Sequence, residues 1–421
     1  MNIVAGKGAY LYDENGRAYF DGLCGLWNVS LGYGNDAIIS AIHQQLTKLP
    51  YANLCEYRND TAYELAERIL AFLHEDMSKI YFTCTGSESN ELAIKIIRKY
   101  QALQGRPYKN QIAVLSSSYH GSYYGSMSAS QFEDGHKRGY GPFLEKFVCF
   151  DLPFCRCCMH GQLSEECLSK MIICLESEMS AHKDTLAGVI IEPVIGSGGI
   201  IPLPKKYLQK LEELCHKNDI LLACDEVATG FGRTGTMFAY EQYDISPDIL
   251  CMSKGINSGY LPLGAVAFHR KIETVFEKTQ EPLFHLSTQN GNPACCAAAL
   301  ATLDHLEKDD FSILRNVRDM SQLLYSQLSQ VLLEHPHVMD IRRAGLMIAI
   351  DLVESKASKE LISENRLLYI VKSLRHNGLI AEYGYNPDVT SCITMFLPFI
   401  IQPAEVEKII SIINKSLQKF V

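Results

Sequence analysis

A lysine at position 254 follows a short apolar run and is the first candidate for covalent chemistry. Residues 247–250 read as a short buried strand, and Gly255 and a turn-rich stretch come directly after the lysine. An amine that a fold holds out of water has a lowered pKa and can form a Schiff base with a carbonyl group. A solvated loop lysine is the alternative interpretation, so the choice depends on the groups placed beside Lys254.

Further polar groups follow other apolar runs that predict strands. Asp225 and Glu192 each come at the end of such a run, and Gly86 and Ser87 stand between a predicted strand and a predicted helix. The free backbone N–H groups and the dipole at a helix N-terminus can receive a phosphate. Ordinary helix capping is the alternative for the glycine and serine, and a cap or loop charge is the alternative for each carboxylate.

The elements that must position these groups alternate along the chain. Apolar runs predict strands at 80–83, 112–115, 147–150, 187–192, 220–226 and 264–268, and amphipathic stretches predict helices at 163–177 and 204–217. This alternation is typical of an α/β domain with a mostly parallel sheet. Ligands of such sheets bind at the carboxyl ends of the strands, so we expect all of the polar groups at one edge.

The two ends of the chain have a different pattern. Alternating apolar residues around Asn15-Gly16 predict a β-hairpin within 8–21. Beyond Pro293 the pattern predicts helices at 294–306, 311–334, 361–376 and 403–417 and strands at 347–352 and 392–396. We therefore expect a large α/β domain over 45–292 and a smaller α+β domain over 293–421, to which an N-terminal segment over 1–44 contributes.

The composition is that of an ordinary globular protein and argues against several partners. The 421 residues carry a net charge of −9 without an extended basic cluster, which disfavours nucleic acid. We expect no secretory signal, and no apolar run approaches the roughly 20 residues of a membrane-spanning helix. Small-molecule chemistry in the cytoplasm is therefore expected, without a membrane partner, and the 15 cysteines are expected as reduced thiols.

A local cysteine cluster covers residues 155–160, Cys-Arg-Cys-Cys-Met-His, with Cys149 and Cys167 nearby. Zinc sites are usually recognised by a C-x-x-C pair with a matching second pair of ligands. The cluster lacks that matching pair. A cysteine-rich loop without a metal is therefore the favoured interpretation, and a zinc site is the alternative.

The amine, the acid and the phosphate seat jointly fit pyridoxal 5′-phosphate (PLP). Its aldehyde needs a lysine, its pyridinium nitrogen needs a carboxylate, and its phosphate needs backbone donors. Residues 225–235, Asp-Glu-Val-Ala-Thr-Gly-Phe-Gly-Arg-Thr-Gly, together with Ser253-Lys254-Gly255, resemble the signature of the class III aminotransferases, the ω-type branch of the fold type I PLP enzymes. The order of further motifs is similar to that of this family, at 86–88, 119–121, 192–194, 258–264 and 291–293.

The resemblance implies a fold type I architecture with a shared active site in a homodimer. Lys254 would form the Schiff base with PLP, and Asp225 would pair with the pyridinium nitrogen. Thr288 would reach the cofactor of the neighbouring subunit. Further cofactor contacts are implied for Gly86, Ser87, Tyr119, His120, Glu192 and Val227, with Trp27 and Glu192 on the substrate side.

The sequence departs from the family at positions that concern the substrate. Members commonly place an arginine for a substrate carboxylate at one of two positions, which here correspond to Glu382 and Thr394. The clamp is then missing, and Glu382 could attract a cationic group; a short alignment gap is the alternative explanation. Ala228 and Ile195 also replace glutamines that are common near the cofactor.

We expect transamination of a terminal amine, for example a diamine, with an oxo acid as the acceptor. The reaction would proceed in two ping-pong half-reactions, with Lys254 moving the proton. Decarboxylation, epimerisation and amino migration are alternatives, because the same cofactor site supports them in the family. A PLP-binding regulatory module is disfavoured because no DNA-binding domain is appended.

Overall fold

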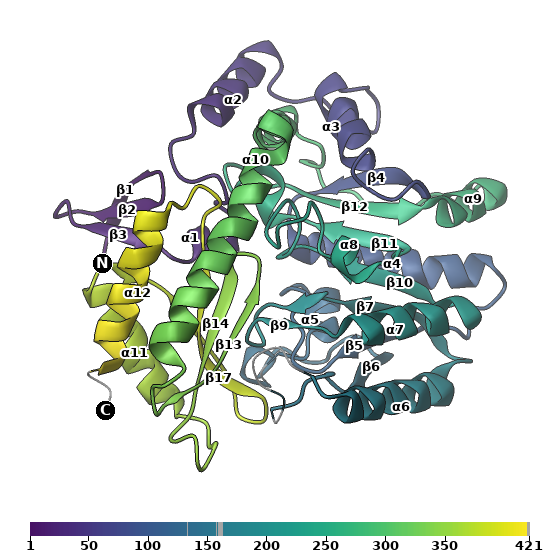
Figure 1. Ribbon diagram of the computed structural model, residues 1–421. Helices are drawn as coiled ribbons and strands as arrows, with labels where there is room; N and C mark the ends of the chain where they lie inside the picture. The colour runs from purple at the N-terminus through teal and green to yellow at the C-terminus, as the bar shows by residue number, and fades with distance from the viewer. Residues whose placement is uncertain (133, 157, 159–162, 419–421) are drawn as a thin grey trace.

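The computed structural model describes residues 1–132, 134–156, 158 and 163–418. Its largest sheet has seven strands in the order β4-β12-β11-β10-β7-β5-β6 (Figure 1). The strands are β4 (Met77–Thr83), β5 (Gln111–Leu115), β6 (Phe147–Phe150), β7 (Leu186–Ile191), β10 (Leu221–Asp225), β11 (Ile249–Met252) and β12 (Gly264–His269). β12 is antiparallel to both of its neighbours, and the other four pairs are parallel, so the predicted mostly parallel sheet is confirmed.

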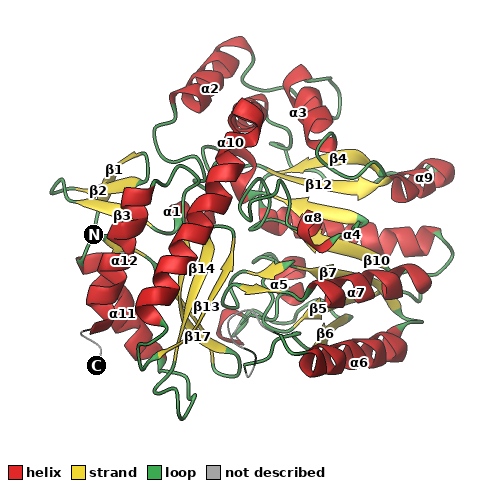
Figure 2. Ribbon diagram, viewed as in Figure 1, coloured by secondary structure: helices red, strands yellow, loops and turns green. Residues whose placement is uncertain are grey.

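Helices cover both faces of this sheet (Figure 2). They include α4 (Gly86–Leu103) and α9 (Arg270–Thr279) on one face, and α6 (Glu165–His182) and α7 (Lys205–Lys217) on the other. Leu222 of β10 packs in the same buried cluster as Leu208 of α7, whereas the next residue, Ala223, belongs to the cluster of Ile97 of α4. Both faces of β10 are thus buried, which explains why its sequence is apolar up to Asp225, its last residue.

The N-terminal strands join a strand from the C-terminal part of the chain. β1 (Ile3–Lys7), β2 (Tyr10–Asp13), β3 (Ala18–Asp21) and β15 (Leu379–Ile380) form one sheet in that order. β2 and β3 are antiparallel, which confirms the predicted hairpin, and β3 pairs with β15 in parallel. An N-terminal strand is thus joined to a strand from the C-terminal part of the chain. The division into an N-terminal segment over 1–44, a large domain over 45–292 and a smaller domain over 293–421 stays a prediction.

Another sheet of four strands, antiparallel throughout, lies in the C-terminal part. Its order is β13 (Val338–Ala344), β14 (Met347–Leu352), β17 (Thr390–Phe396) and β16 (Glu382–Asn386), and it is accompanied by α11 (Glu364–His376) and α12 (Pro403–Gln418). The long α10 (Pro293–Leu332) runs between this part and the seven-stranded sheet (Figure 1). α10 is interrupted at Lys308–Phe311, which is where the sequence predicts the end of one helix and the start of the next.

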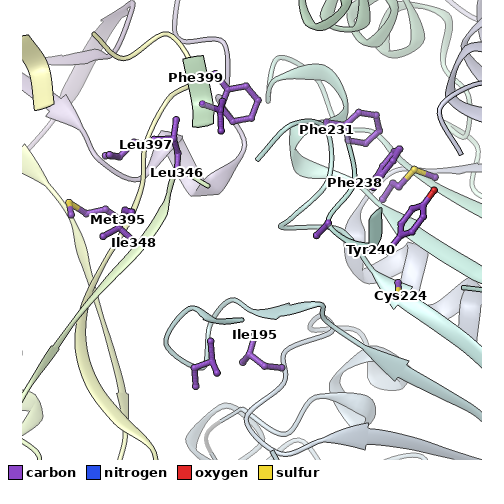
Figure 3. Close-up of a cluster of buried hydrophobic side chains, with 14 of the residues drawn as sticks. Ile195, Cys224, Phe231, Phe238, Tyr240, Leu346, Ile348, Met395, Leu397 and Phe399 are labelled. Carbon is purple, nitrogen blue, oxygen red and sulfur yellow. The ribbon is translucent and has the colours of Figure 1, made fainter. Parts of the chain in front are cut away.

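Buried apolar side chains continue from one part of the chain into the other (Figure 3). Phe231 and Phe238, between β10 and β11, belong to the same core cluster as Leu397 and Phe399, which follow β17. The guanidinium of Arg233 lies 4.7 Å from the ring centroid of Phe399. In the part of the chain that the structure describes, no helix is both long and apolar enough to cross a membrane.

Candidate active site

A cavity of about 530 Å³ lies where the carboxyl ends of β7, β10 and β11 meet the N-terminus of α4 and the edge of the C-terminal sheet. All of the predicted site residues except Thr288 line it. They are Trp27, Gly86, Ser87, Tyr119, His120, Glu192, Asp225, Val227, Lys254 and Glu382. The expectation that strand ends gather these side chains is therefore correct in its geometry.

Lys254 begins the short 3₁₀ helix Lys254–Asn257, two residues after the buried strand β11 ends. Its Nζ lies 4.2 Å from the ring centroid of Trp27. Burial lowers the pKa of Lys254 to about 8, although the carboxylates of Asp225 and Glu192 act in the opposite direction. The neutral amine needed for attack on a carbonyl is therefore far more available than in an ordinary lysine.

Asp225 ends β10 and is buried, with three hydrogen-bond donors around its carboxylate. Its Oδ2 accepts hydrogen bonds from Asn90 Nδ2 and from the Nδ1 of His120, both at 2.8 Å. Its Oδ1 accepts a hydrogen bond from the backbone N–H of Val227 at 3.1 Å. These donors fix the orientation of a carboxylate that faces the cavity, which is what a pyridinium partner requires.

Glu192 follows β7 and connects two loops that border the cavity. Its Oε1 accepts a hydrogen bond from the backbone N–H of Tyr119, and its Oε2 accepts one from the backbone N–H of Gly196, both at 2.9 Å. Burial raises the pKa of Glu192 to about 7. Both carboxylate oxygens are thus used to hold backbone, so Glu192 positions the cavity wall.

The N-terminus of α4 opens toward the cavity at Gly86 and Ser87. Thr85 caps the helix by accepting a hydrogen bond from the N–H of Glu88 at 3.1 Å, which leaves the preceding N–H groups for a ligand. A Cβ at position 86 would lie 2.7 Å from Cγ1 of Val227. Glycine is therefore required there by the close approach of Val227, whose side chain also lines the cavity.

Trp27 and Tyr119 supply aromatic walls. The Trp27 ring stacks on Phe396 with centroids 4.1 Å apart and an interplanar angle of 9°. The Tyr119 ring packs edge-on against Phe132, with centroids 6.4 Å apart. The buried Nε1 of Trp27 and Nε2 of His120 have no hydrogen-bond partner within the described chain, so both are free to serve a bound molecule.

The two positions at which an arginine was expected are cross-strand neighbours. Glu382 of β16 is directly opposite Thr394 of β17, and both line the cavity. Burial raises the pKa of the Glu382 carboxyl, and the charge of Lys254 opposes that shift. Among the described residues that line the cavity there is no arginine.

Three other positions singled out from the sequence, Ala228, Ile195 and Thr288, differ in whether they reach the cavity. Ala228 lines the cavity, but Ile195 is fully buried in the core and is not part of the cavity wall. Thr288 is exposed outside the cavity, and its carbonyl oxygen accepts a hydrogen bond from the Tyr51 hydroxyl at 2.9 Å. Within one chain, therefore, Thr288 does not serve the site.

Among the described contributors to the site that sequence reasoning missed are Asn90 and Glu364. Asn90 binds Asp225 from one helical turn beyond Gly86, and its signal is a polar residue on the buried side of α4. Glu364 also lines the cavity, and it accepts a hydrogen bond from the Tyr383 hydroxyl at 2.8 Å. Its position at the start of α11 carries no local signal of a cavity residue.

The arrangement fits PLP in each of its chemical requirements. Lys254 supplies an amine of lowered pKa, Asp225 supplies an oriented carboxylate, and α4 supplies free N–H groups. The fold and the site thus define a PLP-dependent enzyme with a mostly parallel sheet. Comparison with known proteins gives the family.

The family model described as "Aminotransferase class-III" matches residues 1–417. The chain is 35% identical to the uncharacterized aminotransferase YhxA of Bacillus subtilis, over 99% of this chain and 92% of that protein. It is similar to a solved aminotransferase of Bacillus anthracis, with a TM-score of 0.94, 33% identity and coverage of 99% and 93%. An omega transaminase of Pseudomonas jessenii in complex with PMP gives a TM-score of 0.93, 31% identity and coverage of 100% and 92%.

The chain belongs to the class III aminotransferases. It is a PLP-dependent transaminase, and it uses an amine donor and an oxo-acid acceptor.

Proposed function

We propose that this transaminase acts on terminal amines that carry no carboxylate near the reacting end, with diamines as the best donors. The single observation that carries this proposal is the pairing of Glu382 with Thr394 across β16 and β17, where an arginine clamp was expected. Glu364 lines the same cavity, so a second amino group of the donor would meet carboxylates. Opposite charges at a partly buried site favour the cationic ligand.

The residues of the chain have separate tasks in the proposed reaction. PLP, when bound, supplies an electron sink for the carbon that carries the amino group. Lys254 accepts and returns the proton at that carbon, and its lowered pKa suits this task. Asp225, held by His120 and Asn90, would pair with the pyridinium nitrogen, and the rings of Trp27 and Tyr119 form walls of the cavity.

A comparison of three donors tests the substrate proposal. The holoenzyme is mixed separately with 1,4-diaminobutane, 1-aminobutane and 4-aminobutanoate, without acceptor, and the cofactor absorbance is followed. These donors share one chain length and differ in the charge of the far end. We expect the diamine to react fastest and 4-aminobutanoate slowest. The opposite order would refute the proposal. With a chiral α-amino acid as substrate, release of CO₂ or racemisation without amino transfer would favour the other class III reactions.

We also infer that the enzyme is a homodimer in which Thr288 reaches the cofactor of the partner subunit. Thr288 is exposed and does not line the cavity of its own chain. Phe284 and Leu286, just before it, are 79% and 71% exposed, which is unusual for large apolar side chains so close together. A second copy of the chain covering this segment would bury both side chains and bring Thr288 to a second site.

Mixed variants test this arrangement. Lys254→Ala removes the amine, and Thr288→Ala is expected to weaken cofactor binding about tenfold through the loss of one hydrogen bond to a charged group. In a mixed dimer of the two variants, the site that keeps Lys254 receives Thr288 from its partner. Tight PLP binding should then return at half of the sites. A monomer in sedimentation analysis, or no recovery on mixing, would contradict the shared site. The cytoplasmic location stays a prediction from the sequence.

A further inference from the structure

Three cysteine thiols that the transaminase reaction does not use come together at the N-terminus of α6. Cys155 and Cys158 lie between β6 and α6, and Cys167 lies in the first turn of that helix. Their three Sγ atoms lie within 4.8 Å of one another, and those of Cys155 and Cys167 are 3.4 Å apart. The remaining positions of the predicted cluster, 157, 159 and 160, lie outside the described residues.

The spacing of the sulfur atoms suits a shared metal ion. Four ligands in a tetrahedron around zinc, at Zn–S distances of about 2.3 Å, place neighbouring sulfurs about 3.8 Å apart. The observed separations, from 3.4 Å to at most 4.8 Å, surround that value. A disulfide needs an S–S distance of only about 2.05 Å. Cys155 and Cys158 also have the C-x-x-C spacing that is common among zinc ligands.

Ser164 organises the cluster from the end of the helix. It is the N-cap of α6, and its Oγ accepts a hydrogen bond from the backbone N–H of Cys167 at 3.2 Å. Its own backbone N–H donates to the Sγ of Cys158 at 3.5 Å. Such a donor from the backbone to a ligand sulfur is the kind of outer contact that orients ligands in metal sites. The positive end of the helix dipole also favours thiolates there.

These three cysteines differ from the cysteines of the core. Cys215, Cys224 and Cys251 are fully buried and behave as small apolar side chains. Cys155, Cys158 and Cys167 are only partly buried, so packing does not explain why they gather. These thiols come from the loop before α6 and from α6 itself, and such a convergence is typical of the ligands of a metal ion.

We propose that Cys155, Cys158 and Cys167 bind one structural zinc ion. The described part of the chain supplies three sulfur ligands, so the fourth position of the tetrahedron is taken by water or a further donor. This proposal replaces the favoured interpretation of the sequence, a cysteine-rich loop without metal. The sequence showed no matching second pair, because the third ligand comes singly from the helix.

The ion would brace a loop that connects the two parts of the chain. Arg156 Nη2 donates to the carbonyl oxygen of Lys359 at 2.8 Å, in the segment between β14 and α11. The ring of Phe154 lies 5.6 Å from the guanidinium of Arg342, whose Nη2 donates to the carbonyl oxygen of Gly199 at 2.9 Å. Zinc at the base of this loop would therefore stabilise the contact between the seven-stranded sheet and the C-terminal sheet.

Metal content of the purified holoenzyme tests the proposal directly. The protein is prepared under reducing conditions with zinc sulfate and dialysed, and its bound metal is then measured by inductively coupled plasma mass spectrometry. Cys155→Ser and Cys167→Ser each remove one ligand, and Cys174→Ser is the matched control because Cys174 is an exposed cysteine on the same helix. Cobalt substitution of the wild type reports thiolate coordination through its visible ligand-field bands.

We expect one zinc per protomer in the wild type and in Cys174→Ser, and its loss from the two ligand variants. Removal of zinc by a chelator should raise hydrogen exchange in residues 151–156. If a ligand variant fails to fold, the stoichiometry and the cobalt spectrum of the wild type still decide. Zinc-free wild-type protein in which Cys155, Cys158 and Cys167 all react with a thiol reagent would overturn the proposal. A disulfide between any two of these cysteines, or full zinc retention in Cys167→Ser, would also overturn it.

Discussion

Replacing Glu382 by arginine should reverse the preference of the enzyme between amine donors. The residue lies at the start of β16, lines the cavity and faces Thr394, a short side chain that leaves room for a guanidinium. The wild-type carboxylate attracts a cationic donor and repels a carboxylated one. Glu382→Arg reverses both interactions at once. The ratio of the kcat/KM values for the cationic and the carboxylated donor therefore reports the charge at this position.

The size of the effect follows from the interactions exchanged. One charge-assisted hydrogen bond in a partly buried site contributes about 1.5–3 kcal/mol. The carboxylated donor gains such an interaction with the new guanidinium, and the diamine loses a similar one with Glu382. The preference should therefore change by roughly 3–6 kcal/mol, which is about 10²- to 10⁴-fold in the ratio of kcat/KM values, since about 1.4 kcal/mol corresponds to a factor of ten.

The assay measures kcat/KM for 1,4-diaminobutane and 4-aminobutanoate with one fixed acceptor. Glu382→Gln is the control, because it removes the charge without adding the opposite one, and it should give about half of the change in free energy. The absorbance of bound PLP shows whether each variant keeps an intact cofactor site. An unchanged ratio in Glu382→Arg, with normal cofactor absorbance, would refute the reasoning that this position selects the donor by charge.

Three further predictions concern the site and its support. In the apoenzyme, chemical labelling of Lys254 should increase as the pH rises through about 8, because the neutral amine reacts and burial lowers the pKa; a midpoint near the ordinary lysine value of about 10.4 would contradict this. Gly86→Ala should weaken PLP binding through a clash of about 1–3 kcal/mol with Val227, and adding Val227→Ala should restore binding; titration of the apoenzyme with PLP measures both. Arg342→Met should lower the free energy of unfolding by about 3–5 kcal/mol, because it removes the guanidinium whose Nη1 lies 2.9 Å from Oδ2 of the buried Asp351. The control Arg315→Met removes an exposed ion pair and should cost no more than about 1 kcal/mol. Denaturant unfolding measures both changes.

Local sequence signals predicted most of the elements that position the site. Buried runs such as 187–192 and 220–226 correspond to β7 and β10 within one residue at either end. A strand that is covered on both faces is apolar at nearly every position, so its approximate extent can be read from the composition of the run. The position of β12 and its antiparallel direction were not predictable in this way, because an apolar run does not carry the identity of its neighbours.

The structure narrows the role of Thr288 within its own chain. Its turn-rich segment has the composition of any polar loop, and only the fold places it outside the cavity of its own chain. The exposure of Phe284 and Leu286 beside it is likewise a property of the folded surface. Neither feature has a local signature, because both depend on what the rest of the chain leaves uncovered.

The sequence by itself determined the chemistry of this protein. Lys254, Asp225 and the Gly86-Ser87 turn stand at strand ends, and strand ends are encoded locally by where an apolar run stops. Only the tertiary structure decided the arrangement of partners, such as His120, which binds Asp225 from 105 residues away. It also decided the cross-strand pair of Glu382 with Thr394 and the approach of Cys167 to Cys155. Register and packing between distant segments depend on the whole core, and no short stretch of sequence contains that information.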